Sequence, residues 1–268
     1  MRSFCLILIP TALFGYQVLA PQELDFDTRV GLSTFRVRGP SKNGAEVKGT
    51  GFMIGVENPA KPGVRWPVLV TAAHVVKSIE GDHIVVDMRR RRTPDPLPVG
   101  IQMRSEGKHL YVVHPTDDVA AMFVSGVWDA IDRIWINYEQ IAGDEFFAES
   151  RIHAGENIRV MGFPRGIIAN ESMPVVRSGV IASLLVPPTV KHFVIDSRIF
   201  PGDSGGVVYM NEPERTVSGK ASPVTAVLGI HIGHFAEESA NLGNVLSAEI
   251  VRQTIQLLAP LRKANSRR

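Results

Sequence analysis

The sequence predicts an all-β protein. Short runs rich in branched and aromatic residues recur at regular spacing along the 268 residues, and 24 glycines and 18 prolines fall largely between them. Only one segment, near the end, has a convincing helical period. Short strands bounded by turn residues are typical of barrels and sandwiches rather than alternating β and α units. With 44% hydrophobic residues, the composition excludes a disordered or fibrous chain.

The expected strands fall into two series separated by a mixed stretch at 128–150, which we expect to connect two halves. The first half, 30–127, contains LSTFRV at 32–37, GTGFMIG at 49–55, PVLVTAA at 67–73, HIVVDM at 83–88, VGIQM at 99–103 and HLYVV at 109–113. The second half, 151–247, contains NIRVMGF at 157–163, MPVVRSGVIASLL at 173–185, KHFVIDS at 191–197, GVVYM at 206–210, VTAVLGIHI at 224–232 and GNVLS at 243–247.

The helical period predicts a helix over 248–261. Ile250, Val251 and Ile255 would share its buried face, behind Ser247 as N-cap with Glu249 in the first turn. A short helical turn after Ala73 is a further expectation. A basic tail at 262–268 follows the long helix, and we expect no second module there.

The first 20 residues resemble a secretory signal peptide. Arg2 precedes an apolar run, and Val18 and Ala20 have the spacing of a cleavage signal, although Pro21 is a poor residue after a cut. An uncleaved membrane anchor is the alternative. We expect an exported protein, periplasmic or extracellular, whose mature form lacks Cys5 and so has no disulfide, catalytic thiol or cysteine-bound metal.

The charge distribution gives no reason to expect a nucleic-acid partner. The net charge is only +2, and much of the basic charge lies in the tail and in four arginines at 89–92. We interpret these four as a solvated hairpin loop, with binding to nucleic acid or anionic lipid as the alternative. His231 and His234 do not predict a metal site, because three-residue spacing on a strand points them to opposite faces. No cofactor is expected.

The segment PGDSGG at 201–206 carries the most chemical information. A serine hydroxyl needs a base to become nucleophilic, and the oxyanion that forms needs fixed N–H donors. A tight glycine-rich turn can aim the amides of Gly202 and Ser204 at that oxyanion. The same turn alone could equally be an ordinary hairpin loop.

Two further segments supply partners for this serine. TAAHV at 71–75 places His74 directly after an apolar strand, where an imidazole would be held rigidly as the base. DDVAAMFV at 117–124 places Asp118 directly before another apolar strand, as the carboxylate beside the imidazole. Asp117 is the competing candidate, but we expect its side chain to face water.

In the order histidine, aspartate, serine, these motifs resemble the chymotrypsin-fold serine proteases. GTGFMIG, VMGFPRG at 160–166, SGVIASL at 178–184 and DSRIFPGDSGG extend the resemblance to bacterial Deg-type proteases and glutamyl endopeptidases, over about residues 30–258. The resemblance implies two six-stranded antiparallel β-barrels with a C-terminal helix. It also implies a triad of His74, Asp118 and Ser204 with an oxyanion hole of Gly202 and Ser204, without the peptide-binding domain of the Deg proteins.

The resemblance also implies a specificity pocket. GIHIG at 229–233 resembles the glutamyl endopeptidase strand whose histidine contacts an acidic substrate, which here is His231, and Arg198 falls where the fold builds the pocket floor. Ile199 departs from that family, which has a hydroxyl-bearing residue there. Acidic preference is one hypothesis. The alternative, which we favour, is that Arg198 faces solvent and His231 packs beside a strand.

Asp203 needs a partner if it is buried beside the nucleophile. In trypsin-like enzymes that partner is a new amino terminus, and here a cut after Arg29 would free the Val30 amine. The alternative, which we favour, is that Val30 begins the first strand and that Arg198 or backbone amides satisfy Asp203.

The sequence therefore predicts a secreted, monomeric serine endopeptidase acting on proteins or peptides, in contact with a membrane only if the leader is uncleaved. Two other classes stay open: a catalytically silent binding protein on a protease fold, and a surface-interaction protein that uses the arginine loop at 89–92. A glycosylation sequon at Asn170 is relevant only in a eukaryotic secretory pathway.

Overall fold

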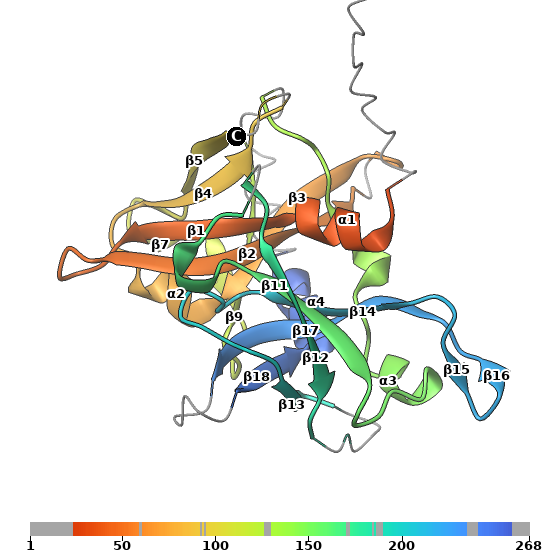
Figure 1. The fold of residues 1–268 in the computed structure, drawn as a ribbon. Coiled ribbons are helices and arrows are strands. Elements are labelled where there is room, and N and C mark those ends of the chain that lie inside the picture. Colours follow the sequence, from red (N-terminus) through yellow and green to blue (C-terminus); the bar gives the residue numbers. More distant parts are fainter. Residues whose placement is uncertain are drawn as a thin grey trace, which may run out of the picture.

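The computed structural model is mostly β and has two adjoining halves (Figure 1). It describes residues 24–58, 61–91, 93, 95–125, 130–169, 172–183, 185, 190–234 and 241–258. The helices are α1 (Phe26–Leu32), α2 (Ala73–Ser78), α3 (Phe146–Glu149) and α4 (Ala248–Gln256), with 3-10 turns η1 (Tyr138–Gln140) and η2 (Pro164–Gly166). No described helix has the length and apolar character required to cross a membrane.

The first half is one eight-stranded sheet, so a closed first barrel is not confirmed. Its strands are β1 (Thr34–Pro40), β2 (Glu46–Glu57), β3 (Arg65–Ala72), β4 (His83–Arg89), β5 (Pro96–Gln102), β8 (Tyr111–Val113), β9 (Val119–Phe123) and β10 (Ile136–Asn137). Their order is β5-β4-β1-β2-β3-β9-β8, and β10 pairs with β2.

The sheet stays open because the chain leaves it between β5 and β8. The amides of Met103 and Arg104 turn to the carbonyl of Asp82, at 2.7 and 3.2 Å, and the hairpin of β6 (Arg104–Ser105) and β7 (Lys108–His109) intervenes. Within the described chain, a single backbone hydrogen bond then links the ends of the two edge strands, β5 and β8. It runs from Leu110 N to Met103 O and is 2.9 Å long.

The second half is a closed six-stranded antiparallel barrel, as expected. Its order is β11-β12-β13-β18-β17-β14. The strands are β11 (Asn157–Gly162), β12 (Val175–Ile181), β13 (His192–Asp196), β14 (Val207–Glu212), β17 (Val224–His234) and β18 (Leu242–Ser247). A hairpin of β15 (Thr216–Val217) and β16 (Lys220–Ala221) projects from it (Figure 1).

The two halves share buried faces at β2 and β3. Along β2, Phe52 and Ile54 pack in the core that includes the second barrel, whereas Met53 packs inside the first sheet. β3 repeats this alternation: Val68 faces the second barrel and Leu69 the first sheet. Because successive side chains of a strand point to opposite faces, both faces of these strands are covered, which explains their unbroken apolar runs.

Helix α1 was not expected from the sequence. Asp25 caps it by accepting a hydrogen bond from Thr28 N at 2.9 Å, and Phe26 and Val30, four residues apart, are buried. Val30 therefore lies inside a helix, and the interpretation that it begins the first strand is wrong. An aspartate followed by two apolar residues at helical spacing was the signal in the sequence.

Helix α4 packs against β17 and β18 and reaches back to β8 and β9 of the first half. Gln253 Oε1 lies 3.2 Å from His114 Nε2, and the Arg252 guanidinium lies 4.7 Å from the ring centre of Tyr138. Ser247 occupies the N-cap position, but its side chain makes no capping hydrogen bond. The helix therefore joins the two halves mainly through packing.

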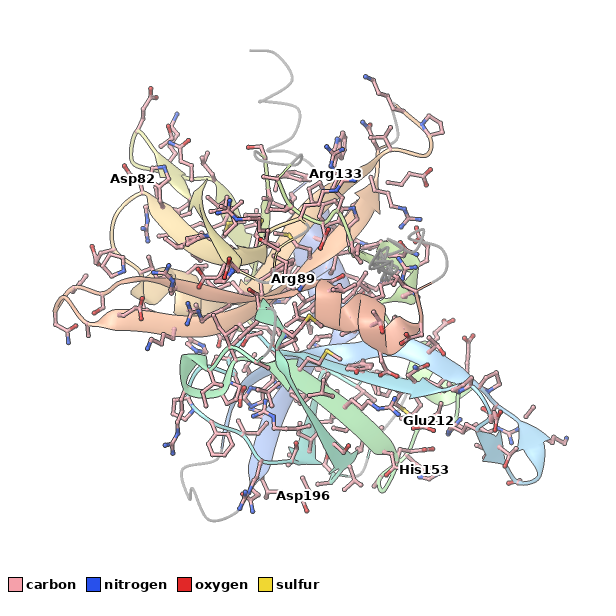
Figure 2. All side chains as sticks on the ribbon, turned by 45° about the horizontal axis from the view of Figure 1, so that its top comes forward. Asp82, Arg89, Arg133, His153, Asp196 and Glu212 are labelled. Carbon is pink, nitrogen blue, oxygen red and sulfur yellow. The ribbon has the colours of Figure 1, made fainter. Side chains whose placement is uncertain are left out.

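Arg89 is not part of a solvated loop, contrary to the expectation for 89–92. Its guanidinium donates to Leu32 O and lies 5.6 Å from the ring centre of Phe35. Only 6% of the residue is exposed, and burial lowers the pKa of Arg89 to about 10. Figure 2 shows it at the centre of the molecule, whereas Arg133 lies farther out. The proposed basic surface thus loses one arginine, and Arg92 lies outside the described residues.

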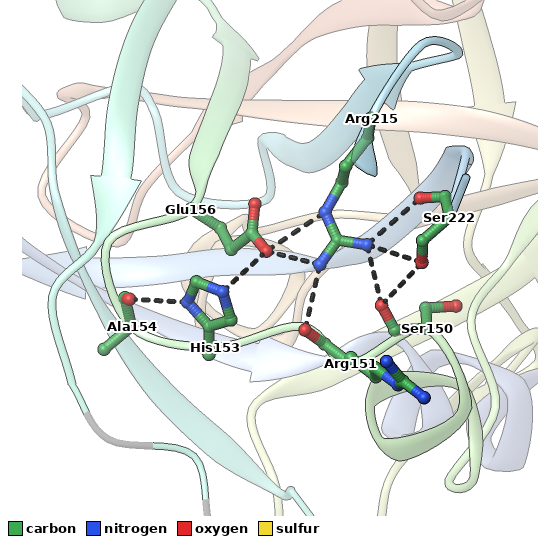
Figure 3. A network of polar contacts seen from close by, with 7 residues as sticks. All are labelled: Ser150, Arg151, His153, Ala154, Glu156, Arg215 and Ser222. Carbon is green, nitrogen blue, oxygen red and sulfur yellow. Dashed lines mark hydrogen bonds and ion pairs between the residues drawn. The ribbon is translucent and has the colours of Figure 1, made fainter. Parts of the chain in front are cut away.

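A second arginine anchors the β15–β16 hairpin (Figure 3). Arg215 donates to the carbonyls of Ser150 and Ser222 at 2.8 and 3.1 Å and pairs with Glu156. His153 Nε2 lies 3.3 Å from the same carboxylate. The network has a structural role, because every nitrogen of the guanidinium has an acceptor.

Three expectations concern residues that the structure does not describe. The leader at 1–20, the tail at 262–268 and Asn170 of the sequon all lie outside the described ranges. They remain sequence-based predictions.

Candidate active site

The histidine and the aspartate are brought together by the pairing of β3 with β9. These strands are antiparallel, and Ala72 lies opposite Val119. Residues that continue past this pair, His74 on α2 and Asp118 before β9, therefore meet at the same edge. A backbone bond of 3.1 Å from Ala73 N to Asp118 O extends the ladder by one step.

The Asp118 carboxylate binds His74 through both oxygens. Oδ1 accepts from the His74 backbone amide at 2.7 Å, and Oδ2 lies 2.5 Å from Nδ1 of the ring. This contact places the proton on Nδ1 and leaves Nε2 free to accept one. The side chains are 47% exposed for His74 and 31% for Asp118, so the pair lies at the protein surface.

Asp117 does not face water, contrary to expectation. Its side chain is only 10% exposed, with Oδ2 3.0 Å from His114 Nδ1 and Oδ1 3.3 Å from His192 Nε2. Asp117 therefore binds two other histidines. Of the two candidate aspartates, Asp118 is the one that contacts His74.

Two consecutive β-turns, at 200–203 and 203–206, share Asp203, and we call them the double turn. Ser204 is the second residue of the second turn. Asp203 N donates to Phe200 O at 3.0 Å, and Gly206 N donates to Asp203 O at 2.7 Å. Gly202 and Gly205 occupy the third position of each turn with φ of +97° and +90°, which only glycine adopts readily. The glycines of PGDSGG thus serve the backbone conformation around the serine.

The double turn is fixed to the first half through Thr50 of β2. Thr50 N donates to Ser204 O at 2.8 Å, and Thr50 Oγ1 donates to Gly202 O at 2.8 Å. The same hydroxyl accepts from Phe163 N at 3.0 Å. A Cβ added at Gly205 would lie 2.0 Å from Thr50 O and 3.0 Å from Ala72 N, so the turn fits directly against the strand end that carries His74.

The double turn is fixed to the second barrel through His231 of β17. Gly205 N donates to His231 O, and His231 N donates to Gly206 O, both at 2.8 Å. The serine is thus held between strands of both halves. By contrast, the amides of Gly202 and Ser204 donate to no acceptor within the described part of the chain, as an oxyanion hole requires.

Ser204 Oγ and the His74 ring make no hydrogen bond with each other in this structure, counting the described residues only. Catalytic hydrogen bonds of this kind are often long before substrate binds. The three residues of the expected triad still converge on one place, the junction of β3, β9 and the double turn.

Asp203 has a partner that the sequence analysis did not identify. The residue is fully buried, and its Oδ2 accepts from Arg177 Nη1 at 2.6 Å and from Phe200 N at 2.8 Å. Of the partners expected from the sequence, a backbone amide does bind Asp203, that of Phe200, whereas Arg198 is exposed and Val30 is buried in α1. Arg177 was missed because its register opposite Val160 on β11 is a long-range property of the barrel.

The two residues of the expected specificity pocket differ in environment. Arg198 is exposed after β13, whereas His231 is 1% exposed and burial lowers its pKa to about 4. Neither ring nitrogen of His231 has a hydrogen-bond partner among the described residues. His231 is therefore neutral at physiological pH and carries no charge for an acidic substrate to meet.

Thr50 is the second residue of the site that the sequence analysis missed. It stands in the GTGFMIG motif, and its side chain is fully buried in the structure. No group of three or more metal-binding side chains occurs in the described ranges.

Comparison with known proteins identifies a family for this chain. Residues 49–217 match the family model of the trypsin-like peptidase domain, a stretch that contains His74, Asp118 and Ser204. A comparison with curated proteins finds no sequence match.

Solved structures share the fold at low sequence identity. The protease Rv3671c from M. tuberculosis H37Rv matches in an inactive serine-to-alanine mutant form, with a TM-score of 0.51, 19% identity and coverage of 88% of this chain and 90% of that one. Its active form matches with a TM-score of 0.50 and 19% identity over 87% of this chain and 84% of that one. The HtrA-type protease AlgW with a tripeptide has a TM-score of 0.55 at 16% identity, over 87% of this chain and 63% of its own.

Proposed function

Because this chain belongs to the trypsin-like peptidase family, we propose that it is a serine endopeptidase whose catalytic residues are Ser204, His74 and Asp118. The observation that carries the proposal is the carboxylate of Asp118 held on both His74 N and Nδ1, beside a serine on the double turn. A structural histidine would need no second contact that fixes its tautomer.

The proposed reaction proceeds through an acyl-enzyme. Ser204 Oγ attacks the peptide carbonyl while His74 Nε2 takes the hydroxyl proton, and Asp118 stabilises the imidazolium. The amides of Gly202 and Ser204 donate to the oxyanion. His74 then gives its proton to the leaving amine, and a water molecule, activated by the same nitrogen, releases the peptide acid and restores the serine.

Covalent labelling tests this proposal. The full chain is treated with an organophosphonate, and the labelled peptide is identified by mass spectrometry. We expect labelling at Ser204 and loss of both labelling and peptide hydrolysis in Ser204→Ala. A folded wild-type chain that hydrolyses no peptide and takes up no label would contradict the proposal and favour the silent binding protein.

A preference for acidic substrates is a finer part of the proposal. An accessible Arg198 could attract a carboxylate, whereas both ring nitrogens of His231 are buried in this structure. Because exposed ion pairs contribute about 1 kcal/mol or less, Arg198→Ala should lower kcat/KM for acidic peptides by only about fivefold. Cleavage of a diverse peptide library by both proteins measures the preference, and an aliphatic preference unchanged by Arg198→Ala would refute it.

We also propose that the protein is exported and works outside the cytoplasm, on the basis of the leader-like residues 1–20. N-terminal sequencing of the protein recovered from its native host tests this. A chain that still begins at Met1 in the cytoplasmic fraction would contradict it.

A further inference from the structure

The buried ion pair of Arg177 and Asp203 lies directly behind the double turn. Asp203 is shared by both turns, since its amide closes the first and its carbonyl closes the second. The peptide groups that flank its Cα carry its own N–H and that of Ser204, and the Gly202 amide lies one peptide earlier, inside the turn that Asp203 N closes. A rotation of the Asp203 backbone therefore redirects the Ser204 amide and opens the turn that holds the Gly202 amide.

The Asp203 carboxylate depends on Arg177 for its burial. Its exposed fraction is 0%, and Arg177 supplies the one ion-pair contact that it makes among the described residues. Its other oxygen, Oδ1, has no hydrogen-bond partner in the described chain and faces Gly162, where an added Cβ would lie 2.8 Å away. An unpaired buried carboxylate costs several kcal/mol, so without the arginine this side chain would turn toward water.

Arg177 is well placed to be a permanent partner. It extends from the regular strand β12, opposite Val160 of β11, and its side chain is 13% exposed. Both neighbouring strands belong to the closed barrel. The cation is thus present as soon as the barrel has formed.

The alternative cation, an amine at Val30, is not available in this structure. Val30 is 0% exposed within α1, and its carbonyl accepts from Thr34 Oγ1 at 2.8 Å. The helix is also fixed to β14, where Tyr209 Oη donates to Asp27 Oδ1 at 2.8 Å. A cut after Arg29 would require this helix to unfold.

The geometry points to Arg177 as a positioning residue that holds the oxyanion amides through Asp203 and makes the enzyme competent without cleavage after Arg29. This inference rests on the proposed serine endopeptidase function. It adds that the active conformation is built into the barrel and does not depend on a new amino terminus.

A double-mutant cycle on kcat tests the first part. Arg177→Met should lower kcat by about 10²- to 10³-fold, the effect of losing an oxyanion donor, with a much smaller change in KM. When Asp203→Asn is already present, the same exchange should change kcat little, because no charge is left unpaired. Arg159→Met, which removes an ion pair with Asp27 elsewhere in the barrel, is the matched control and should keep wild-type kcat.

Three outcomes would overturn the inference: wild-type kcat in folded Arg177→Met, an equal loss in both Asp203 backgrounds, or an equal loss in Arg159→Met. If Arg177→Met does not fold, Arg177→Lys takes its place in the same cycle, with a smaller loss of the same pattern. Guanidinium ion added to Arg177→Met should restore part of the activity, which a purely structural defect would not allow.

Processing is tested separately with Arg29→Gln. We expect full activity from a chain that retains the Arg29–Val30 bond, as shown by N-terminal sequencing. Activity that appears only in chains beginning at Val30 would overturn the inference. Labelling of the wild type at Ser204 separates failure of this inference from failure of the proposed function. If the wild type is labelled and Arg177→Met keeps wild-type kcat, only the inference is wrong. If the wild type is not labelled, the proposed function itself is wrong.

Discussion

His74 and Asp118 lie at the partly exposed ends of two paired strands, whereas Ser204 lies on a double turn that both halves must hold. The first pair needs only the β3–β9 ladder and its own two contacts. The serine needs Thr50 from the first half, His231 from the second and the buried pair of Arg177 and Asp203. The comparison teaches that the proposed base is positioned by local structure and the proposed nucleophile by the assembled molecule.

Breaking the local pair should have the largest effect on turnover. Asp118→Asn places an amide beside Nδ1 and favours the wrong tautomer of His74, so kcat should fall on the order of 10⁴-fold while the fold is kept. The measurement is steady-state peptide hydrolysis. Asp117→Asn is the control, and a greater loss there than in Asp118→Asn would show that the aspartates have been assigned to the wrong roles.

The next prediction tests whether the position of Ser204 depends on the close packing of the double turn against Thr50. Gly205→Ala introduces a Cβ 2.0 Å from Thr50 O at a positive φ, so the double turn cannot keep its place and kcat should fall about 10²-fold or more. Gly219→Ala is the control, since its φ is +74° but nothing lies within 4 Å of the added carbon. Kinetics on both variants separate backbone strain from steric overlap. Equal losses would mean that the contact with Thr50 is unimportant.

Removing the Thr50 hydroxyl tests the link between the halves. Thr50→Val keeps the shape but leaves Gly202 O and Phe163 N without their shared partner. Each unsatisfied buried group costs about 1 to 3 kcal/mol, so the free energy of unfolding should fall by about 3 kcal/mol. Urea denaturation measures it. Thr254→Val is the control and should lose less, because among the described residues the Thr254 hydroxyl bonds only to Ile250 O of its own helix.

The smallest effect concerns pH and the buried ring of His231. Burial lowers its pKa to about 4 from the ordinary 6.5. Between these two pH values, His231 is therefore protonated in the unfolded chain but neutral in the folded chain. The free energy of unfolding should therefore fall as pH drops from 6.5 toward 4, by about 2 kcal/mol between pH 8 and pH 5. In His231→Gln, this fall in the free energy of unfolding at low pH should be absent. Parallel pH dependences in the two proteins would contradict the assignment.

The sequence predicted much of the strand framework because both halves present regular apolar runs. β2 and β3 are buried on both faces, which makes their runs conspicuous. The open first sheet was not foreseen, because the divergence at Met103 depends on backbone bonds to Asp82. Helix α1 was missed because seven residues give little helical periodicity.

For the site, local motifs predicted the residues that strand ends position. His74 and Asp118 each adjoin an apolar strand, and the pairing of these two strands, β3 and β9, is enough to bring the side chains together. Arg177 and Thr50 could not be found in this way, because each contacts the double turn across a register that no local pattern specifies. The same reason explains the error over Arg89, whose buried contacts with Leu32 and Phe35 come from a distant part of the chain.

A ribosome completes His74, Asp118 and Ser204 before it reaches the strand that closes the barrel. β18 pairs with both β13 and β17, so the second half stays open until residues 242–247 have been synthesised. Helix α4, which packs on β9 and β17, follows later still. A nascent chain that ends before β18 therefore contains the three proposed catalytic residues without the framework that aligns them. We expect such a chain to lack the proposed peptidase activity, which would need the whole fold through α4.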